Sequence, residues 1–241
     1  MRKAGRAVAG IVLATAAPAA AATLDIEASS DLRRRGIGWS DGRPALEAYA
    51  SLPITGPLTA EIGAATLRGS RRHGGADAVA DAALRLTTRT GPWQLWADVV
   101  GHGFIGGAGA LDYGEVRVGS SFGLGPAQLG VQAAWAPAQA AIGGSNLYFG
   151  ARAAIGIPGT PWTVAAAAGR STGTADATGR SNRLRPGGDY TDVRLDVDYV
   201  LGALTLGASA TATSIDRDRI ADPATAEDVR PRLLVRAALR F

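Results

Sequence analysis

The chain contains no cysteine and only two histidines among its 241 residues. Without cysteine it forms no disulfides, so packing and backbone hydrogen bonds alone must hold the fold. This excludes a disulfide-stapled secreted scaffold. Because two histidines and no thiolate are a poor supply of transition-metal ligands, we expect no metal site and no other cofactor.

Long apolar runs are also missing, apart from a short one at the start. Arg2, Lys3 and Arg6 form a basic segment, an apolar stretch covers residues 7–17, and four alanines occupy positions 19–22. This pattern is typical of a secretory signal peptide. We expect cleavage after Ala22, which leaves residues 23–241 as a single domain. No later stretch approaches the roughly 20 apolar residues that a membrane helix requires.

Beyond the signal segment, the chain has almost no excess of charge of either sign. Three of its 25 basic residues lie in that segment, which leaves 22 basic against 21 acidic residues in the rest. The formal net charge of +4 is therefore no indication of nucleic-acid binding.

What the sequence does contain is alternation with a period of two. Val193, Leu195, Val197 and Tyr199 alternate with charged residues, and residues 232–241 repeat the pattern. Similar segments are residues 24–32, 45–52, 58–66, 78–87, 93–100, 115–122, 127–135, 147–157, 162–168 and 204–212. Alternation of this kind is typical of strands with one apolar and one polar face. We predict about twelve strands, an even number as in bacterial membrane barrels.

The connections between these segments alternate between short and long. Short turns rich in Gly and Pro occupy residues 53–57, 89–92, 123–126, 158–161 and 201–203, and long loops occupy residues 33–44, 67–77, 101–113, 136–145, 169–189 and 213–231. Glycine and proline supply the turn geometry at the ends of paired strands. The alternation predicts an all-β fold, a transmembrane antiparallel up-and-down barrel with periplasmic turns and extracellular loops.

Aromatic residues favour a membrane barrel over a soluble β-sandwich. Trp93, Phe122, Trp162, Tyr199 and Phe241 lie beside short turns or at the chain end, all with outward parity. Rings of this kind belong at a membrane interface, whereas a sandwich would point them into its core. We predict a location in the outer membrane of a Gram-negative bacterium, surrounded by lipid and lipopolysaccharide. The terminal strand ending in Phe241 should be recognised by the barrel-assembly machinery.

The inward face of the predicted strands carries charges of both signs. We expect the pore to be lined by Asp25, Glu27, Glu47, Glu61, Asp81, Arg85, Asp98, Glu115, Arg117, Arg152, Asp192, Arg194, Asp196, Arg232, Arg236 and Arg240. Such a face fits either a salt-bridged plug or the wall of a wet channel. Twelve strands lie between filled and wide barrels, so we predict a narrow pore. Opposed charges would favour small neutral or zwitterionic hydrophilic solutes over ions of either sign.

Catalysis is the least supported function. His102 and Ser120 have inward parity on neighbouring strands but sit toward opposite ends of their hairpin, so we expect no catalytic pair. We expect His73 to be a solvated loop residue. The glycines of residues 101–106 match a dinucleotide-binding pattern, but no helix pattern follows, which indicates a loop. A porin, a structural or adhesive surface barrel and, last, a barrel enzyme acting on lipid remain open.

The first long loop and its flanks resemble a family hallmark. The matching residues are Ser30, Asp31, Arg35, Gly36, Ser40, Pro44 and Ala45. They are similar to a motif near the mature N-terminus of the TorF-type porin family, which comprises proteobacterial outer-membrane proteins of similar length. The resemblance implies a barrel of porin type and carries over no catalytic residue.

Overall fold

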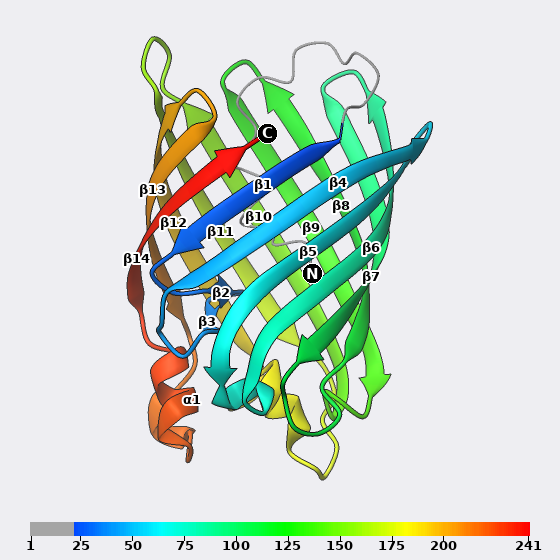
Figure 1. The fold of residues 1–241 in the computed structure, drawn as a ribbon, viewed down its shortest axis with the longest axis vertical. Coiled ribbons are helices and arrows are strands. Elements are labelled where there is room, and N and C mark those ends of the chain that lie inside the picture. Colours follow the sequence, from blue (N-terminus) through cyan, green and yellow to red (C-terminus); the bar gives the residue numbers. More distant parts are fainter. Residues whose placement is uncertain (1–21) are drawn as a thin grey trace.

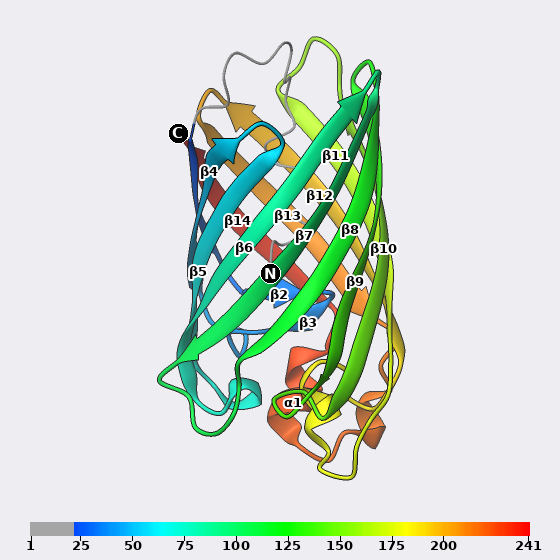
Figure 2. The same cartoon turned by 90° about the vertical axis from the view of Figure 1, so that its right-hand side faces the viewer.

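Twelve antiparallel strands close into a barrel in the computed structural model, which describes residues 22–241 (Figures 1 and 2). They are β1 (Thr23–Ser29), β4 (Ala45–Thr55), β5 (Leu58–Ser70), β6 (Ala76–Thr90), β7 (Trp93–Ile105), β8 (Tyr113–Leu124), β9 (Ala127–Gln139), β10 (Gly144–Gly156), β11 (Trp162–Thr172), β12 (Tyr190–Leu201), β13 (Leu204–Thr213) and β14 (Arg232–Arg240). The predicted fold class and strand number are confirmed. The predicted signal peptide, apart from Ala22, lies outside the described residues.

Closure pairs the first strand with the last. In the register of β1 and β14, Asp25 faces Arg240 and Ser29 faces Arg236. Asp25 and Arg240 form an ion pair of 2.7 Å. Arg236 turns instead toward β12, where it pairs with Asp196 and Asp198. Backbone hydrogen bonds complete the wall, as a barrel in lipid requires.

The two ends of the barrel differ (Figure 1). One end, called the turn end, carries the short hairpin turns and Phe241. The other, the loop end, carries the short helices η1 (Arg71–His73), η2 (Arg180–Arg183), η3 (Arg217–Arg219) and α1 (Pro223–Asp228). Two further short strands, β2 (Arg33–Arg34) and β3 (Ile37–Gly38), pair with each other and stand apart from the barrel wall. Among residues 22–241, no helix is long and apolar enough to cross a bilayer.

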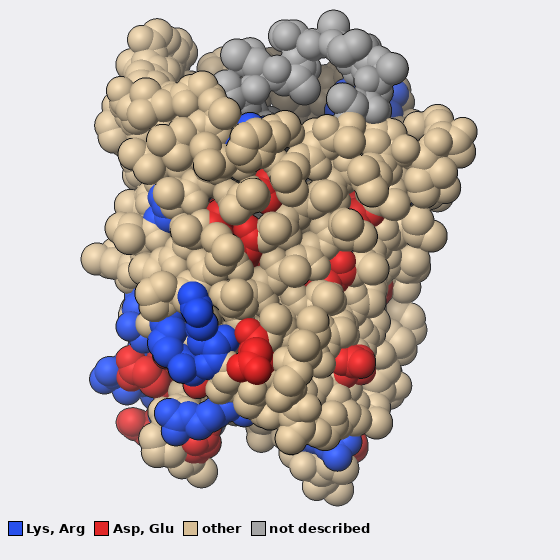
Figure 3. Space-filling model, in the orientation of Figure 1, with Lys and Arg blue, Asp and Glu red and all other residues tan. Residues whose placement is uncertain are grey.

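Every second side chain of a strand points away from the lumen. These outward side chains are mostly apolar, so the outer face of the wall is apolar. Leu233 is 82% exposed and Leu195 60% exposed, values that fit contact with lipid rather than with a protein core. Charged side chains gather instead at the loop end, close to α1 (Figure 3).

Aromatic rings lie on this outer face near both ends of the barrel. At the turn end, the rings of Trp93 and Phe122 are 4.8 Å apart between centroids, and those of Trp162 and Tyr199 are also 4.8 Å apart. Phe241 is exposed beside them. Two more outward aromatics lie farther toward the loop end, Trp135 on β9 and Phe149 on β10. The sequence pattern at the turns predicted only the aromatic residues of the turn end.

Candidate functional site

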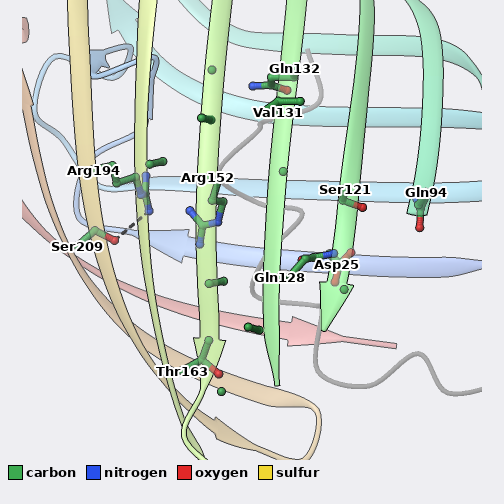
Figure 4. A pocket seen from close by; sticks show the side chains of 18 of the residues that line it. Asp25, Gln94, Ser121, Gln128, Val131, Gln132, Arg152, Thr163, Arg194 and Ser209 are labelled. Atoms are coloured by element: carbon green, nitrogen blue, oxygen red, sulfur yellow. Dashed lines mark hydrogen bonds between the residues drawn. The ribbon is translucent and has the colours of Figure 1, made fainter. Parts of the chain in front are cut away.

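The interior of the barrel is divided into an open half and a packed half. A cavity of about 1170 Å³ extends from the short turns at the turn end to residues 32–36. Polar side chains from several strands line its wall (Figure 4). Small residues such as Gly130, Ala154 and Gly156 leave this space free, because no longer side chain fills it there.

The cavity wall presents more positive than negative side chains. Among residues 22–241, ten arginines line the cavity, against five aspartates and glutamates. Three predicted pore-lining carboxylates lie behind the arginines instead: the side chains of Glu61, Asp98 and Asp196 are each at most 2% exposed. The charges of both signs expected from the sequence are therefore present, but the positive ones are nearer the lumen.

One group of buried ion pairs lies on β5 to β8. Asp98 accepts hydrogen bonds from Arg85 Nε at 2.8 Å and from Arg117 Nε at 2.6 Å. Arg85 also reaches Glu61 at 3.4 Å and lies over the ring of Trp96, 4.3 Å from its centroid. Each carboxylate thus fixes an arginine against the wall. The lumen stays wide between this group and the opposite wall.

A second group lies across the lumen on β10 to β14. Asp196 on β12 binds Arg152, Arg194 and Arg236 at 2.7 to 3.1 Å. Arg236 also contacts Asp198. Three guanidinium groups share these two carboxylates, and Glu27 of β1 also lies near Arg236.

The packed half begins with residues 30–44, the inner loop, which connects β1 to β4 and turns into the lumen (Figure 2). Arg35 and Gly36 form the tip of its β2–β3 hairpin, with φ of 52° and 76°. Positive φ at both positions defines a type I′ turn, which favours glycine. A Cβ at Gly36 would lie 2.7 Å from Thr213 Cγ2 and 2.8 Å from Asp192 Cβ. The tip therefore presses against the wall at β12 and β13.

Three successive arginines join the inner loop to different sectors of the wall. Arg33 donates to Thr211 Oγ1 of β13 at 3.1 Å. Arg34 pairs with Asp81 of β6 at 3.1 Å and Glu47 of β4 at 3.8 Å. Arg35 pairs with Glu115 of β8 at 2.7 Å and lies over Tyr148 of β10, 4.7 Å from the ring centroid. Inward carboxylates of β4, β6 and β8 are in this way paired with the inner loop.

Residues of the family-like motif hold the inner loop in shape. Ser40 Oγ donates to Asp31 Oδ1 at 2.9 Å and accepts from the backbone N–H of Leu32 at 2.9 Å. Ser30 Oγ accepts from the N–H of Val235 on β14 at 3.1 Å. The predicted first strand was too long at its end, since β1 stops at Ser29 and Leu32 is buried inside the lumen.

Long loops pack over the inner loop and form a cover at the loop end. Trp39 of the inner loop lies 4.4 Å from His73, and His73 lies 5.0 Å from Phe104, between ring centroids. Arg183 of η2 lies over Phe104 and donates to the backbone oxygens of Leu111 and Ala141. Apolar residues such as Leu67, Ile142 and Leu184 complete this core. The loops thus build a small hydrophobic interior of their own.

His73 lies at the centre of this cover, and its predicted solvation was wrong. It is 0% exposed, because Trp39, Phe104 and Arg183 pack around it from distant parts of the sequence. His73 Nδ1 accepts a hydrogen bond from Arg183 Nε at 3.2 Å. Burial lowers the pKa of His73 well below 6.5, and the guanidinium groups of Arg183, Arg72 and Arg34 lower it further.

Acidification should loosen the cover through His73. The imidazole is neutral in the closed cover but titrates near 6.5 when released, so its stabilising contribution is complete above that pH and is lost as the pH falls below it. We expect His73→Gln to match the unmodified protein at about pH 7.5. At about pH 5 its amide exchange at residues 71–75 should be slower by roughly tenfold. Burial raises the pKa of Asp228 to about 6, but this group is common to both proteins and cancels in the comparison. Equal exchange of the two at about pH 5 would show that His73 plays no part.

The structure places the other predicted site residues in three settings. Of the predicted pore-lining residues, those that line the cavity are Asp25, Glu27, Glu47, Arg85, Arg117, Arg152, Asp192, Arg194, Arg236 and Arg240. Asp81 and Glu115 bind the inner loop, as described above. Arg232 lies at the loop end, where it pairs with Glu227 of α1 at 3.1 Å. The arginines of the inner loop itself, which also line the cavity, were missed.

His102 and Ser120 do not form a site. His102 faces Tyr113 and Ser120 faces Leu95 in the β7–β8 register, which separates them by seven residues along the strand, or about 23 Å. His102 Nδ1 lies 2.8 Å from Asp81 Oδ1 and is buried within the lumen. Within residues 22–241, no group of three or more His, Asp or Glu could hold a metal ion.

Solved structures of outer-membrane porins share the closed antiparallel barrel fold. The fold is similar to the NanC porin, with a TM-score of 0.60 at 11% identity over 90% of this chain and 98% of that one. It is also similar to the KdgM porin, with a TM-score of 0.58 at 4% identity over 91% and 98%. A second structure, described as the KdgM porin in complex with disordered oligogalacturonate, has a TM-score of 0.56 at 4% identity over the same shares. At these identities the likeness shows the fold alone.

The family follows from a sequence match. The chain belongs to the Gcw_chp family, described as a bacterial protein of unknown function, whose model matches residues 99–234. This region runs from β7 to β14 and leaves out the inner loop. No curated protein matches the chain.

Proposed function

We propose that the chain is a porin with a narrow lumen for passive diffusion of small hydrophilic solutes. The cavity of about 1170 Å³ inside a closed barrel, lined by charged and polar side chains, carries this proposal. An eight-stranded barrel would be filled by side chains, whereas twelve strands enclose a wider interior. The proposal assigns no catalytic step to the chain.

The inner loop would act as the gate of this porin. Its hairpin ends the cavity, and the cover packs behind it with Leu67 and His73 fully buried. A solute would pass only when the inner loop moves away from the wall. The ion pairs of Arg34 and Arg35 would then have to exchange for water or for solute.

The membrane setting follows from the outer face. Its apolar rows and aromatic rings would contact outer-membrane lipid, with the turn end toward the periplasm and the loop end toward lipopolysaccharide. Phe241 and the outward row of β14 would be read by the barrel-assembly machinery. Assignment to the TorF-type porins rests on the inner-loop motif and forms part of this proposal.

Recording from single proteins in a planar bilayer tests the porin function. Because the inner loop closes the lumen, we expect small conductance steps of folded protein separated by long closed periods. Folding is checked beforehand by the shift in gel mobility on boiling. Folded protein that gives no conductance above the bilayer baseline would contradict the porin function. The alternative would then be a surface barrel that works through its loops, for which the packed cover is the supporting observation.

A further inference from the structure

Two arginines of the cavity wall lie in one row across neighbouring strands. The strand registers align Gly130, Arg152, Ala167, Arg194 and Thr211 across β9 to β13. Arg152 and Arg194 are two strands apart, which places their Cα atoms about 10 Å from each other. Between them Ala167 contributes only a methyl group. The result is a recess with a guanidinium group on either side.

The carboxylate that orients both arginines is hidden from the cavity. Asp196 Oδ2 accepts from Arg152 Nη1 at 3.0 Å, and Asp196 Oδ1 accepts from Arg194 Nε at 2.7 Å. The Asp196 side chain is 0% exposed and also binds Arg236 and Ser209. Its acceptor capacity is therefore used on the wall side. The guanidinium groups, in contrast, stand on the cavity side.

Arg152 keeps unused donors beside this recess. Its Nε and Nη2 atoms are buried and have no hydrogen-bond partner, although an unpaired buried donor is costly and is normally satisfied. Figure 4 shows Arg152 and Arg194 lining the cavity, with Gln128 and Gln132 on the neighbouring strand β9. These two amides flank Gly130, which pairs with Arg152, so they lie diagonally beside Arg152.

We propose that Arg152 and Arg194 bind the carboxylate of a small hydroxylated anion, such as a sugar acid, within the cavity. A carboxylate matches the forked donors of arginine and would form charge-assisted hydrogen bonds with them. Gln128 and Gln132 offer donors and acceptors for the hydroxyl groups of such a solute. Asp192, two residues before Arg194 on β12, also lines the cavity and would repel a second negative charge. The site rests on the proposed porin function and names its substrate class.

Binding to the full-length folded protein in detergent tests the site without any need for conductance. Glucuronate is the probe and glucose is the matched neutral sugar, both measured by calorimetry. We expect glucuronate to bind and glucose to bind at least on the order of tenfold more weakly. The double variant Arg152→Gln, Arg194→Gln should bind glucuronate on the order of tenfold more weakly than the unmodified protein. Its binding of glucose should be unchanged. Asp196 keeps Arg236 and Ser209 as partners in this variant, and its folding is checked by gel mobility.

Two further measurements make the test specific. Arg170→Gln removes the same charge from the outer side of β11, at a side chain 59% exposed, and should leave glucuronate binding unchanged. Arg152→Lys keeps the charge but not the fork, so it should retain anion preference in bilayer recordings while glucuronate binds more weakly. Equal binding of glucuronate by the double variant and by the unmodified protein would overturn the site.

Failure of the site can be told apart from failure of the porin function. Conductance steps without glucuronate binding or anion preference would overturn the site while the porin stands. Glucuronate binding that the double variant abolishes, in a protein without conductance, would support the site and reject diffusion through the barrel.

Discussion

Replacing residues 30–44 with Asn-Gly is expected to turn the barrel into a steadily open channel. Ser29 and Ala45 are paired neighbours in the β1–β4 ladder, so the two new residues can join them in a two-residue hairpin turn. The variant removes the hairpin that ends the cavity together with Trp39 from the cover. Conductance in planar bilayers should rise on the order of tenfold over the unmodified protein, with the closed periods shortened.

A milder variant separates the effect of the ion pairs from the effect of the loop's bulk. Arg34→Ala combined with Arg35→Ala keeps the inner loop but removes its ion pairs to Asp81, Glu47 and Glu115. We expect this variant to open more often than the unmodified protein without reaching the conductance of the replacement variant. If both variants conduct no better than the unmodified barrel, the inner loop is not the gate.

Asp98→Asn is expected to destabilise the folded barrel by about 3–5 kcal/mol, because it leaves two buried arginines without their main carboxylate. Asp98 is 0% exposed as a side chain, and its partners Arg85 and Arg117 are at most 6% exposed. Asn keeps the size of the residue, so the change tests charge rather than packing. Urea unfolding in lipid vesicles, followed by gel mobility, measures the free energy of unfolding.

Asp25→Asn is the matched control, because it removes the same kind of ion pair at a partly exposed position. Arg240 and Asp25 are 43% and 30% exposed, so water can replace the lost partner and the expected cost is about 0–1 kcal/mol. Equal costs for the two variants would mean that water reaches Asp98 and that the lumen wall is wetter than its packing indicates.

The barrel itself could be predicted from the sequence because its signal is local. Along β12, Val193, Leu195 and Val197 face outward and Asp192, Asp196 and Asp198 face inward. The polarity of each of these residues thus indicates the face of the wall on which it lies. Turn chemistry is equally local, since glycine and proline mark the ends of paired strands. Neither inference needed contacts between distant parts of the chain.

The inner loop and the cover could not be predicted in the same way, since their partners are remote in sequence. Arg34 meets Asp81 across 47 residues and Arg33 meets Thr211 across 178. Two signals were nevertheless present. Ile37 and Trp39 are large apolar residues in a segment predicted to be an extracellular loop, and Arg33, Arg34 and Arg35 form a run of cations next to strands with inward carboxylates. His73 carried no comparable signal, because its burial depends on residues remote in sequence, such as Trp39 and Arg183.

The inner loop also has a consequence for the order in which the protein assembles. It is attached to β1, the strand that completes the circle, and its arginines require Asp81 of β6, Glu115 of β8 and Thr211 of β13 to be in place. Contacts of such long sequence separation form late, because the entropy of closing long loops must be met first. The paired strands would therefore first form a hollow, water-filled intermediate. The inner loop would enter the lumen only as β1 pairs with β14. Closing the wall and closing the lumen would then be a single event.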